Sequence, residues 1–495
     1  MKNRLADKKE QTLHFSLIRV YKPAPKVSVE IPLGLLYIIA AVREKFPGRF
    51  QFQIIDMPLN GLSVDETVDR AMSPRADIVG ISAFTFENDV VKDIVRKIRE
   101  RREDTTILLG GPYATASTRL AIEENPGADF AIIGESEVSL PTLLDILFQN
   151  GNPEHMHGIA YRENGNPRIL PLKAFIEDLD TLPLPAWDHL EIDSYNNSPL
   201  RPTNHFRKQK RAVPVFTSRG CPYQCAYCHK IFGKKLRVRS AEHFLKELLL
   251  LYEKYNVREI HVLDDAFNLD RPRMRRICRM IIENHLDLAI GFSSGLRGDR
   301  LEEEDIDLLQ QAGAYFIRYA VETASPRLQK KIHKNVQLDK LERIVDYTVK
   351  KRIFTQGLFM LGFPGETPEE LQLTVQYALK SKFHTLGVYQ VVPFPGTDLH
   401  AMAKALKPDY EYDPHYLFFS GKSFYQEATG MDLNPVKSNL YLRFYANPTR
   451  MFRILRDIPE KGGLFKGGIS FLNNTIFRRI WVRKGFMRRD PLESK

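Results

Sequence analysis

The sequence predicts an α/β protein with two successive domains and a helical C-terminal segment. Short apolar runs rich in β-branched and aromatic residues alternate with helical patterns in two stretches, and the alternation is lost after residue 400. At 495 residues the chain is also too long for a single hydrophobic core. We expect a doubly wound domain over residues 12–150, a linker over 151–206, a partial (βα)6 barrel over 207–400 and a basic, aromatic, mostly helical segment over 401–495.

Five apolar runs predict the strands of the first domain. They are LHFSLIRV, FQIID, DIVGISAF, TTILLGG and DFAIIGE, and helical patterns such as PLGLLYIIAAVREKF lie between them. Apolar strands that alternate with helices are typical of a parallel sheet covered on both faces, with a Rossmann-like or flavodoxin-like order. Ligands of such folds bind at the C-terminal ends of the strands, where this sequence has Gly110, Gly111 and Gly134.

Six further apolar runs predict the strands of the second domain. They are AVPVFTS, EIHVLDD, AIGFSSG, YFIRYAVE, FTQGLFMLG and LGVYQVV. Six βα units resemble a TIM-like barrel or part of one. In barrels the reacting groups lie at the C-terminal ends of the strands, so we expect the functional residues there.

Composition and charge exclude several classes of protein. Four cysteines are too few for a disulfide framework and indicate a reducing, cytoplasmic setting. No signal-peptide pattern follows the charged N-terminus, and the longest apolar stretch, residues 31–42, is shorter than the roughly 20 residues of a membrane span. From Met431 onward there are 14 Lys and Arg against 5 Asp and Glu, which predicts a local basic surface and disfavours a general nucleic-acid binder.

Three of the four cysteines lie within eight residues of TSRGCPYQCAYCHK, directly after the first predicted barrel strand. They are Cys221, Cys225 and Cys228. A structural zinc site usually has two paired motifs, although His229 could complete one, and a redox CxxC leaves the first cysteine unexplained. The fourth cysteine, Cys278, lies on the apolar face of a helical pattern and is interpreted as a buried small hydrophobe. Three thiolates suit a [4Fe-4S] cluster with one open iron.

This C-x3-C-x2-C spacing, with Tyr227 before the last cysteine, resembles the signature of the radical S-adenosylmethionine (SAM) superfamily. The resemblance implies that Cys221, Cys225 and Cys228 hold the cluster. It also implies that the open iron chelates SAM and that an electron from the cluster cleaves SAM to a 5'-deoxyadenosyl radical.

Motifs after the later strands extend the resemblance. Asp264 and Asp265, in HVLDDAFNLD, match a patch near the SAM amino group, and Arg297, in SSGLRGDRL, matches a SAM carboxylate or substrate contact. The simpler alternative is that the two aspartates cap the following helix. FMLGFPGET and VVPFPGTDL resemble segments that close the SAM pocket, and each is otherwise a turn.

Glu322, in YAVETASPRLQKK, resembles the glutamate that hydrogen-bonds SAM in this family. The sequence departs from the usual pattern at Thr323 and Ala324, where Ser and Gly are common. The simpler alternative is that the carboxylate pairs with Arg318 or Arg327.

The first domain resembles the cobalamin-binding domain that precedes the barrel in one subfamily. The segments IPLGLLYIIAAV, ADIVGISAFT, LLGGPYAT and IIGESE and the connector EDLDTLPLPAWD carry the resemblance, which spans about residues 12–400. Small residues after strands let the backbone approach a flat macrocycle. The residues expected to line it are Ser82, Gly110, Gly111, Thr115 and Gly134. A GxGxxG fingerprint is absent, which disfavours a dinucleotide, and no D-x-H-x-x-G motif supplies a cobalt-ligating histidine.

Together the resemblances imply a [4Fe-4S] cluster, SAM and cobalamin as cofactors, and an enzyme that methylates an unactivated carbon. An oxidative cyclase like the anaerobic protoporphyrin-ester cyclase is the alternative within the superfamily. A non-catalytic iron–sulfur or cobalamin-sensing protein is the alternative of another class. The expected partners are a small-molecule substrate and an electron donor such as a flavodoxin or ferredoxin.

The C-terminal segment interleaves aromatic residues with Arg and Lys. It is expected to form a helical cap over the barrel with arginine tips in water. It also suits peripheral contact with the inner membrane face, which would make the substrate a lipid or isoprenoid. Single-stranded nucleic acid is a weaker third option. The membrane hypothesis depends on Arg478, Arg479, Arg483 and Arg488.

Overall fold

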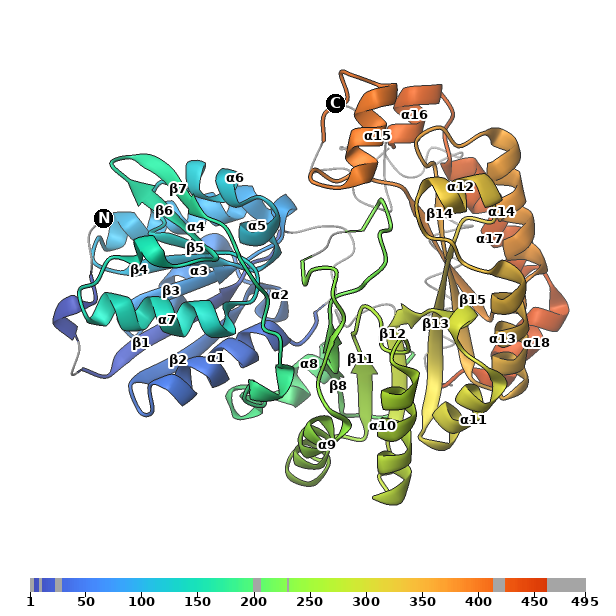
Figure 1. The fold of residues 1–495 in the computed structure, drawn as a ribbon, viewed down its shortest axis with the longest axis horizontal. Coiled ribbons are helices and arrows are strands. Elements are labelled where there is room, and N and C mark those ends of the chain that lie inside the picture. The colour runs from blue at the N-terminus through green and yellow to red at the C-terminus, as the bar shows by residue number, and fades with distance from the viewer. Residues whose placement is uncertain are drawn as a thin grey trace, which may run out of the picture. The chain divides into compact units, whose positions relative to one another are not determined.

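The fold is that of a computed structural model, which describes residues 4–8, 11–22, 29–198, 206–228, 231–412 and 423–460. The chain divides into two compact units (Figure 1). The first unit comprises Met1–His205, Arg211–Pro222 and His229–Val257. The second unit comprises Phe206–Lys210, Tyr223–Cys228 and Arg258–Lys495. The segments interleave around the cysteine motif, so that Cys221 belongs to the first unit and Cys225 and Cys228 to the second.

The first unit begins with the expected doubly wound domain. Its strands are β1 (Leu13–Arg19), β2 (Phe50–Asp56), β3 (Ile78–Ser82), β4 (Thr106–Gly110), β5 (Phe130–Ile132), β6 (Ile159–Glu163) and β7 (Asn166–Leu170). Its helices are α1 (Leu33–Lys45), α2 (Met57–Asn60), α3 (Val64–Ala71), α4 (Asn88–Arg101), α5 (Gly111–Ala116), α6 (Thr118–Glu123), α7 (Ser136–Phe148) and α8 (Ile192–Asn197). The five strands that the apolar runs predict are all present.

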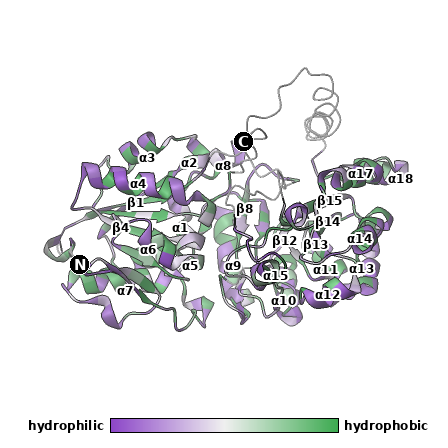
Figure 2. Cartoon of the chain, turned by 90° about the horizontal axis from the view of Figure 1, so that it is seen from above, coloured by the Kyte–Doolittle hydropathy of each residue, from purple (hydrophilic) through white to green (hydrophobic). Residues whose placement is uncertain are grey.

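The sheet order is β2-β1-β3-β4-β5-β6-β7, and β1 to β5 are parallel. The order of these five is the flavodoxin-like one, whose ligand crevice lies at the carboxyl ends of the strands. Buried side chains of α1 and α7 pack on one face of the sheet and those of α3 and α4 on the other. Helices α3 and α4 carry hydrophobic and hydrophilic residues on different faces, as expected for helices that cover a sheet with one face, whereas α1 and α7 have mostly apolar sequences (Figure 2).

Strands β6 and β7 lie within the segment that the sequence predicts as a linker. They pair antiparallel with each other, and β6 pairs antiparallel with β5, so they extend the sheet. The second of them contains Pro167 and lies at the sheet edge, where a missing backbone N–H is tolerated. Residues 151–206 are therefore not solely a linker, and the proline-rich composition concealed the two strands.

The last part of the first unit surrounds the cysteine motif. Its elements are β8 (Ala212–Val215), β9 (Ser218–Arg219), β10 (Arg237–Val238) and α9 (Ala241–Leu249). Strands β9 and β10 form a short antiparallel ribbon in which Arg219 faces Arg237. The chain between the two strands carries the three cysteines.

The second unit continues the βα alternation. Its strands are β11 (Glu259–Val262), β12 (Ala289–Leu296), β13 (Ala314–Glu322), β14 (Phe354–Leu361) and β15 (Thr385–Gln390). Its helices as far as residue 406 are α10 (Arg271–Glu283), α11 (Glu303–Gln311), α12 (Pro326–Lys331), α13 (Leu338–Lys350), α14 (Pro368–Lys380) and α15 (Asp398–Leu406). The second sheet has the predicted six strands, and the five within this unit run parallel in the order β15-β14-β13-β12-β11.

The described C-terminal residues are helical, as expected, and consist of α16 (Phe424–Thr429), α17 (Asn434–Tyr445) and α18 (Pro448–Asp457). Ile454 of α18 packs in a buried cluster with Ala289, Phe316 and Phe354, which begin or nearly begin β12, β13 and β14. Helix α18 thus covers the N-terminal ends of these strands, opposite to the ends where barrels place their chemistry.

One arginine of this segment differs from the expectation of arginine tips in water. Arg450 is buried, and its guanidinium donates to the backbone oxygens of Phe444, Leu379 and Ser381. The four arginines of the membrane hypothesis, Arg478, Arg479, Arg483 and Arg488, lie outside the described residues. Among the helices that are described, none combines the length and the apolar character needed to cross a bilayer.

Candidate functional site

The carboxyl ends of β3, β4 and β5 bring the five predicted cobalamin contacts together. Ser82 and Gly110 end neighbouring strands and are register partners. The hydroxyl of Thr115 in α5 donates to the carbonyl of Gly111 (3.0 Å) and accepts from the backbone N–H of Gly134 (3.0 Å). One threonine therefore joins the turn after β4 to the turn after β5.

At two of the three glycines of this edge, a larger residue would meet a steric conflict. Gly111 has a φ of +75°, and a Cβ there would lie 2.7 Å from the Ser82 hydroxyl oxygen. Gly134 has a φ of +79°, and its Cβ would lie 2.7 Å from a methyl group of Leu172. A Cβ on Gly110 would meet only the Ile81 carbonyl, at 3.9 Å, so the protein leaves that position open. An open backbone edge suits a broad, flat ligand.

Charged residues at the ends of β1 and β2 were not singled out from the sequence. Arg19 and Asp56 are register partners, and Arg19 Nη1 lies 3.4 Å from Asp56 Oδ2. The Tyr195 hydroxyl also donates to this buried carboxylate (2.9 Å). Nearby, Glu87 accepts from the N–H of Phe84 (2.7 Å), and burial raises the pKa of Glu87 to about 7. The signal that could have identified these residues is a charged side chain at the end of an apolar strand.

The loop that begins the cysteine motif is held by tight turns. Gly220 has a φ of +82°, and a Cβ there would lie 2.3 Å from the carbonyl oxygen of Lys235. The N–H of Cys221 donates to the carbonyl of Gly233 (3.3 Å). Close packing of backbone on backbone fixes the approach to the first cysteine.

In the second unit, the segment with Cys225 and Cys228 docks on the turn after α12. Ala226 donates its N–H to the Ile332 carbonyl (2.9 Å), and Cys225 Sγ lies 3.9 Å from the His333 carbonyl. The first of these two cysteines is buried and the second is exposed, and neither forms a disulfide.

Tyr227 of the cysteine motif and the predicted SAM contact Glu322 meet directly. The Tyr227 hydroxyl donates to Glu322 Oε1 (3.1 Å), and Lys334 Nζ lies 3.4 Å from the same oxygen. Burial, together with the Glu322 carboxylate, raises the pKa of Tyr227 well above its ordinary value. The alternative that Glu322 pairs with Arg327 is wrong, because Arg327 pairs with Glu370. Arg318 donates to the Ser293 carbonyl and to the side-chain oxygen of Gln356. Lys334 was not anticipated.

The predicted contact Arg297 is buried and has its donors engaged within the unit. Its Nε and Nη2 donate to the two oxygens of Asp299 (2.8 Å each), and Nη1 donates to the Lys334 carbonyl (3.0 Å). Its guanidinium also lies 4.1 Å from the centre of the Tyr223 ring. These contacts favour a role in holding the Lys334 turn, and direct contact with SAM stays a prediction.

The strand β11 is followed by Asp264, which is buried, and Asp265, which is exposed. Neither caps α10, because Asp270 is its N-cap and accepts from the Arg273 N–H (3.0 Å), so the capping alternative is wrong. Cys278 within α10 is 2% exposed, and burial raises the pKa of its thiol to about 12. Its interpretation as a buried small hydrophobe is confirmed.

The residues present fit the expected cofactors by their chemistry. Cys221, Cys225 and Cys228 are three free thiols at a spacing that suits a [4Fe-4S] cluster, and at Gly110 an added Cβ would meet only the Ile81 carbonyl at 3.9 Å, which is compatible with close approach of a flat ligand. Within the described ranges, no three His, Cys, Asp or Glu side chains lie close enough together to hold a metal ion. The ligand assignment therefore depends on the thiol set and its spacing.

Comparison with known proteins gives two family matches on the chain. Residues 27–144 match the B12 binding domain, and residues 215–378 match the radical SAM superfamily. The first match covers the edge that carries Gly110 and Gly111, and the second covers the cysteine motif and Glu322.

Several relatives span most of this chain. An uncharacterized methyltransferase of Pyrococcus horikoshii is 28% identical over 87% of this chain and 91% of its own length. The cytidylyl-2-hydroxyethylphosphonate methyltransferase of Streptomyces wedmorensis is 27% identical over 74% of this chain and 77% of its own length. The anaerobic magnesium-protoporphyrin IX monomethyl ester cyclase of Rubrivivax gelatinosus is 24% identical over 70% of this chain and 61% of its own length.

The fold is also similar to a solved structure. The radical SAM methyltransferase TsrM from Kitasatospora setae, determined with cobalamin and a [4Fe-4S] cluster bound, has a TM-score of 0.64 and 18% identity. The match covers 82% of this chain and 76% of that one. The chain therefore carries a region that matches the B12 binding domain, followed by a region that matches the radical SAM superfamily.

Proposed function

We propose that the protein is a cobalamin-dependent radical SAM methyltransferase that methylates an unactivated carbon of a small molecule. The observation that carries the proposal is that one chain has both a backbone edge suited to cobalamin and a cysteine motif whose Tyr227 is hydrogen-bonded to Glu322. When bound, SAM and the cluster supply a 5'-deoxyadenosyl radical, and cobalamin supplies the methyl group.

The residues divide between three tasks in this proposal. Cys221, Cys225 and Cys228 hold the cluster. The residues assigned to SAM are Tyr227, Asp264, Asp265, Arg297 and Glu322. The residues assigned to cobalamin are Ser82, Gly110, Gly111, Thr115 and Gly134. Lys334 orients the Glu322 carboxylate through the contact of its ammonium group with Oε1 (3.4 Å).

The choice of methyl transfer over cyclisation is supported by the relatives. The Pyrococcus horikoshii methyltransferase aligns over 91% of its own length, whereas the Rubrivivax gelatinosus cyclase aligns over 61% of its own. An electron donor of the flavodoxin or ferredoxin kind and a cytoplasmic location complete the proposal. A more specific version of the proposal is that the substrate is a lipid or isoprenoid presented at a membrane, which the basic C-terminal composition supports.

Anaerobic reconstitution with iron, sulfide and hydroxocobalamin tests the proposal. After desalting we expect about four irons and one cobalt per chain, and release of 5'-deoxyadenosine with SAM and dithionite. Cys225→Ala is expected to lose the iron, whereas Cys278→Ala, which alters a buried cysteine outside the motif, should retain it.

The other outcomes select the alternatives. A cluster with SAM cleavage but without cobalt would favour the cyclase. Bound cofactors without SAM cleavage would favour the sensor. Absence of any cluster in the unmodified chain would overturn the radical SAM proposal.

A further inference from the structure

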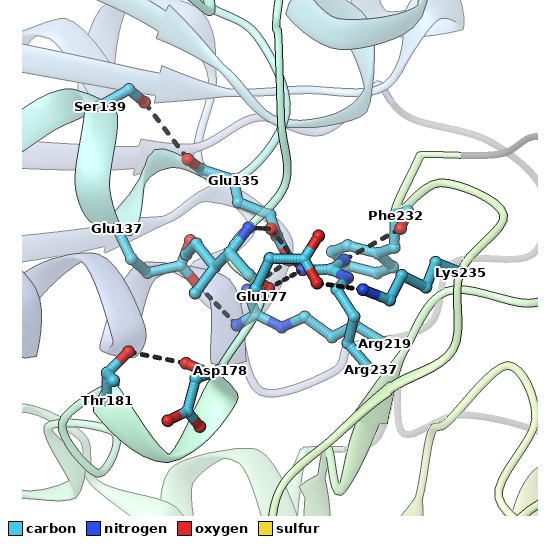
Figure 3. A network of polar contacts seen from close by, with 11 residues as sticks. Glu135, Glu137, Ser139, Glu177, Asp178, Thr181, Arg219, Phe232, Lys235 and Arg237 are labelled. Atoms are coloured by element: carbon cyan, nitrogen blue, oxygen red, sulfur yellow. Dashed lines mark hydrogen bonds and ion pairs between the residues drawn. The ribbon is translucent and has the colours of Figure 1, made fainter.

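Four buried charged side chains join the turn after β5 to the cysteine loop within the first unit (Figure 3). Glu135 and Glu137 begin α7, and Arg219 and Arg237 face each other across the β9–β10 ribbon. Their side chains are between 2% and 8% exposed. The two positive and two negative charges balance, as burial in a region of low dielectric requires.

Glu135 is the centre of this cluster. Its Oε1 accepts from Arg219 Nη1 (3.0 Å) and Arg237 Nη1 (2.9 Å). Its Oε2 accepts from the same Arg237 nitrogen (2.7 Å) and from the Ile176 N–H (2.9 Å). Among the described residues, Glu137 accepts a hydrogen bond only from Arg219 Nη2 (2.6 Å). Loss of the Glu135 charge would thus affect both arginines, and loss of the Glu137 charge only one.

Each end of the cluster is one or two residues from a proposed cofactor contact. Gly134, whose N–H is bound by Thr115, directly precedes Glu135. On the other side, Arg219 is followed by Gly220 and then Cys221. A Cβ at Gly220 would lie 2.3 Å from the Lys235 carbonyl, so the backbone between Arg219 and Cys221 is closely packed. A displacement of Arg219 is therefore expected to move Cys221.

A second contact extends the connection across the cysteine loop. Arg237 Nη2 donates to the Phe232 carbonyl (2.9 Å), and the neighbouring Gly233 accepts the N–H of Cys221 (3.3 Å). Arg219 and Arg237 therefore hold the two sides of the loop from the same carboxylate. Simple stabilisation does not require this arrangement, since well-packed apolar residues of similar volume are often as stabilising as a buried ion pair.

We propose that Glu135 is a positioning residue that couples the turn at Gly134 to the loop at Cys221, so that cobalamin and the iron–sulfur cluster strengthen each other's binding. This inference rests on the proposed function, because it takes these two positions to be cofactor contacts. The coupling is reciprocal by thermodynamic necessity.

The test measures hydroxocobalamin affinity of the full chain by equilibrium dialysis, with and without the reconstituted cluster. In the unmodified chain we expect the cluster to tighten cobalamin binding at least about fivefold. In Glu135→Gln the two affinities should be equal. Lys235→Ala is the matched control. Lys235 lies in the same cysteine loop but forms a mostly exposed ion pair with Glu177, so this variant should keep the full coupling.

Circular dichroism of the apoprotein checks that the variant folds. If Glu135→Gln does not fold, Glu137→Gln replaces it and should reduce the coupling without abolishing it. Equal coupling in the unmodified chain and in a folded Glu135→Gln would overturn the inference. Binding of both cofactors without any coupling in the unmodified chain would also overturn it and leave the proposed function intact, whereas failure to bind either cofactor would overturn the proposed function itself.

Discussion

The two proposed cofactor edges of this protein are built differently. In the first unit, Gly110, Gly111 and Gly134 present backbone at the ends of the strands. In the second unit, Glu322, the last residue of β13, forms a buried ion pair with Lys334, which follows α12. An edge made of backbone is sensitive to added volume, and an edge made of paired charges is sensitive to lost charge. The difference predicts which substitutions damage each unit.

The largest effect is expected from added volume in the first unit. Gly111→Ala combines a left-handed backbone with a Cβ 2.7 Å from the Ser82 hydroxyl oxygen, and should lower the free energy of unfolding by about 3 kcal/mol. Gly61→Ala has a similar φ of +63° but open space around the Cβ, and should cost about 1 kcal/mol. Urea denaturation measures both values, and hydroxocobalamin retention should fall only in the first variant. Equal costs would show that the close approach to Ser82 has no consequence.

Lost charge in the second unit is expected to act on SAM. Glu322→Gln keeps an acceptor for the Tyr227 hydroxyl but leaves the buried Lys334 without its carboxylate. Equilibrium dialysis of the cluster-loaded chain should show SAM affinity about 30-fold weaker, equivalent to about 2 kcal/mol. Glu302→Gln, which removes a partly exposed partner of Lys340, should change the affinity by less than about twofold. A normal SAM affinity in Glu322→Gln would contradict the assigned role.

In both units, a buried carboxyl makes a smaller, pH-dependent contribution to the free energy of unfolding. Burial raises the pKa of Glu87 in the first unit and of Glu366 in the second to about 7, from an ordinary value of 4.5. Glu366 accepts from the N–H groups of Gly362 and Phe363 through Oε2, while its buried Oε1 has no hydrogen-bond partner among the described residues. Both folded-state carboxyls therefore hold their protons more tightly than the unfolded chain does.

The sign of the pH dependence follows from this difference. Below about pH 4.5 both states are protonated and the extra stability is fully present, and it is lost as pH rises through about 7. Each carboxyl should contribute on the order of 1–2 kcal/mol to the fall in unfolding free energy between pH 5 and 8. Denaturant titrations at several pH values should show a flatter profile for Glu87→Gln and for Glu366→Gln. An unchanged slope in either variant would mean that its carboxyl is ionised in the folded state.

Part of the architecture could be predicted because its signals are local. Apolar runs and helical patterns repeat within a few residues, so β1 to β5 and the six strands of the second sheet were expected. The cysteine spacing and the glycines after β4 and β5 are equally local, and the structure brings the predicted residues of the β3–β5 edge together. The buried state of Cys278 followed from its place on an apolar helix face.

The partners of the buried charged side chains could not be predicted from short stretches of sequence. Glu135 meets Arg219 across 84 residues of chain and Arg237 across 102. The pairing of Lys334 with Glu322 and the contacts of Arg297 with Asp299 and the Lys334 carbonyl were not predicted, while a contact of Arg297 with SAM or the substrate stays a prediction.

The sequence by itself determined the order of the strands and helices, the cysteine motif and the small residues at the strand ends. It did so because periodicity, steric allowance and thiol spacing are properties of short segments. Only the tertiary structure decided that Pro167 lies on an edge strand, that α18 covers the N-terminal strand ends and which buried charges are paired. The reason is that desolvation makes a buried charge depend on whichever opposite charge the fold places beside it, and that placement is set by segments far apart in the chain.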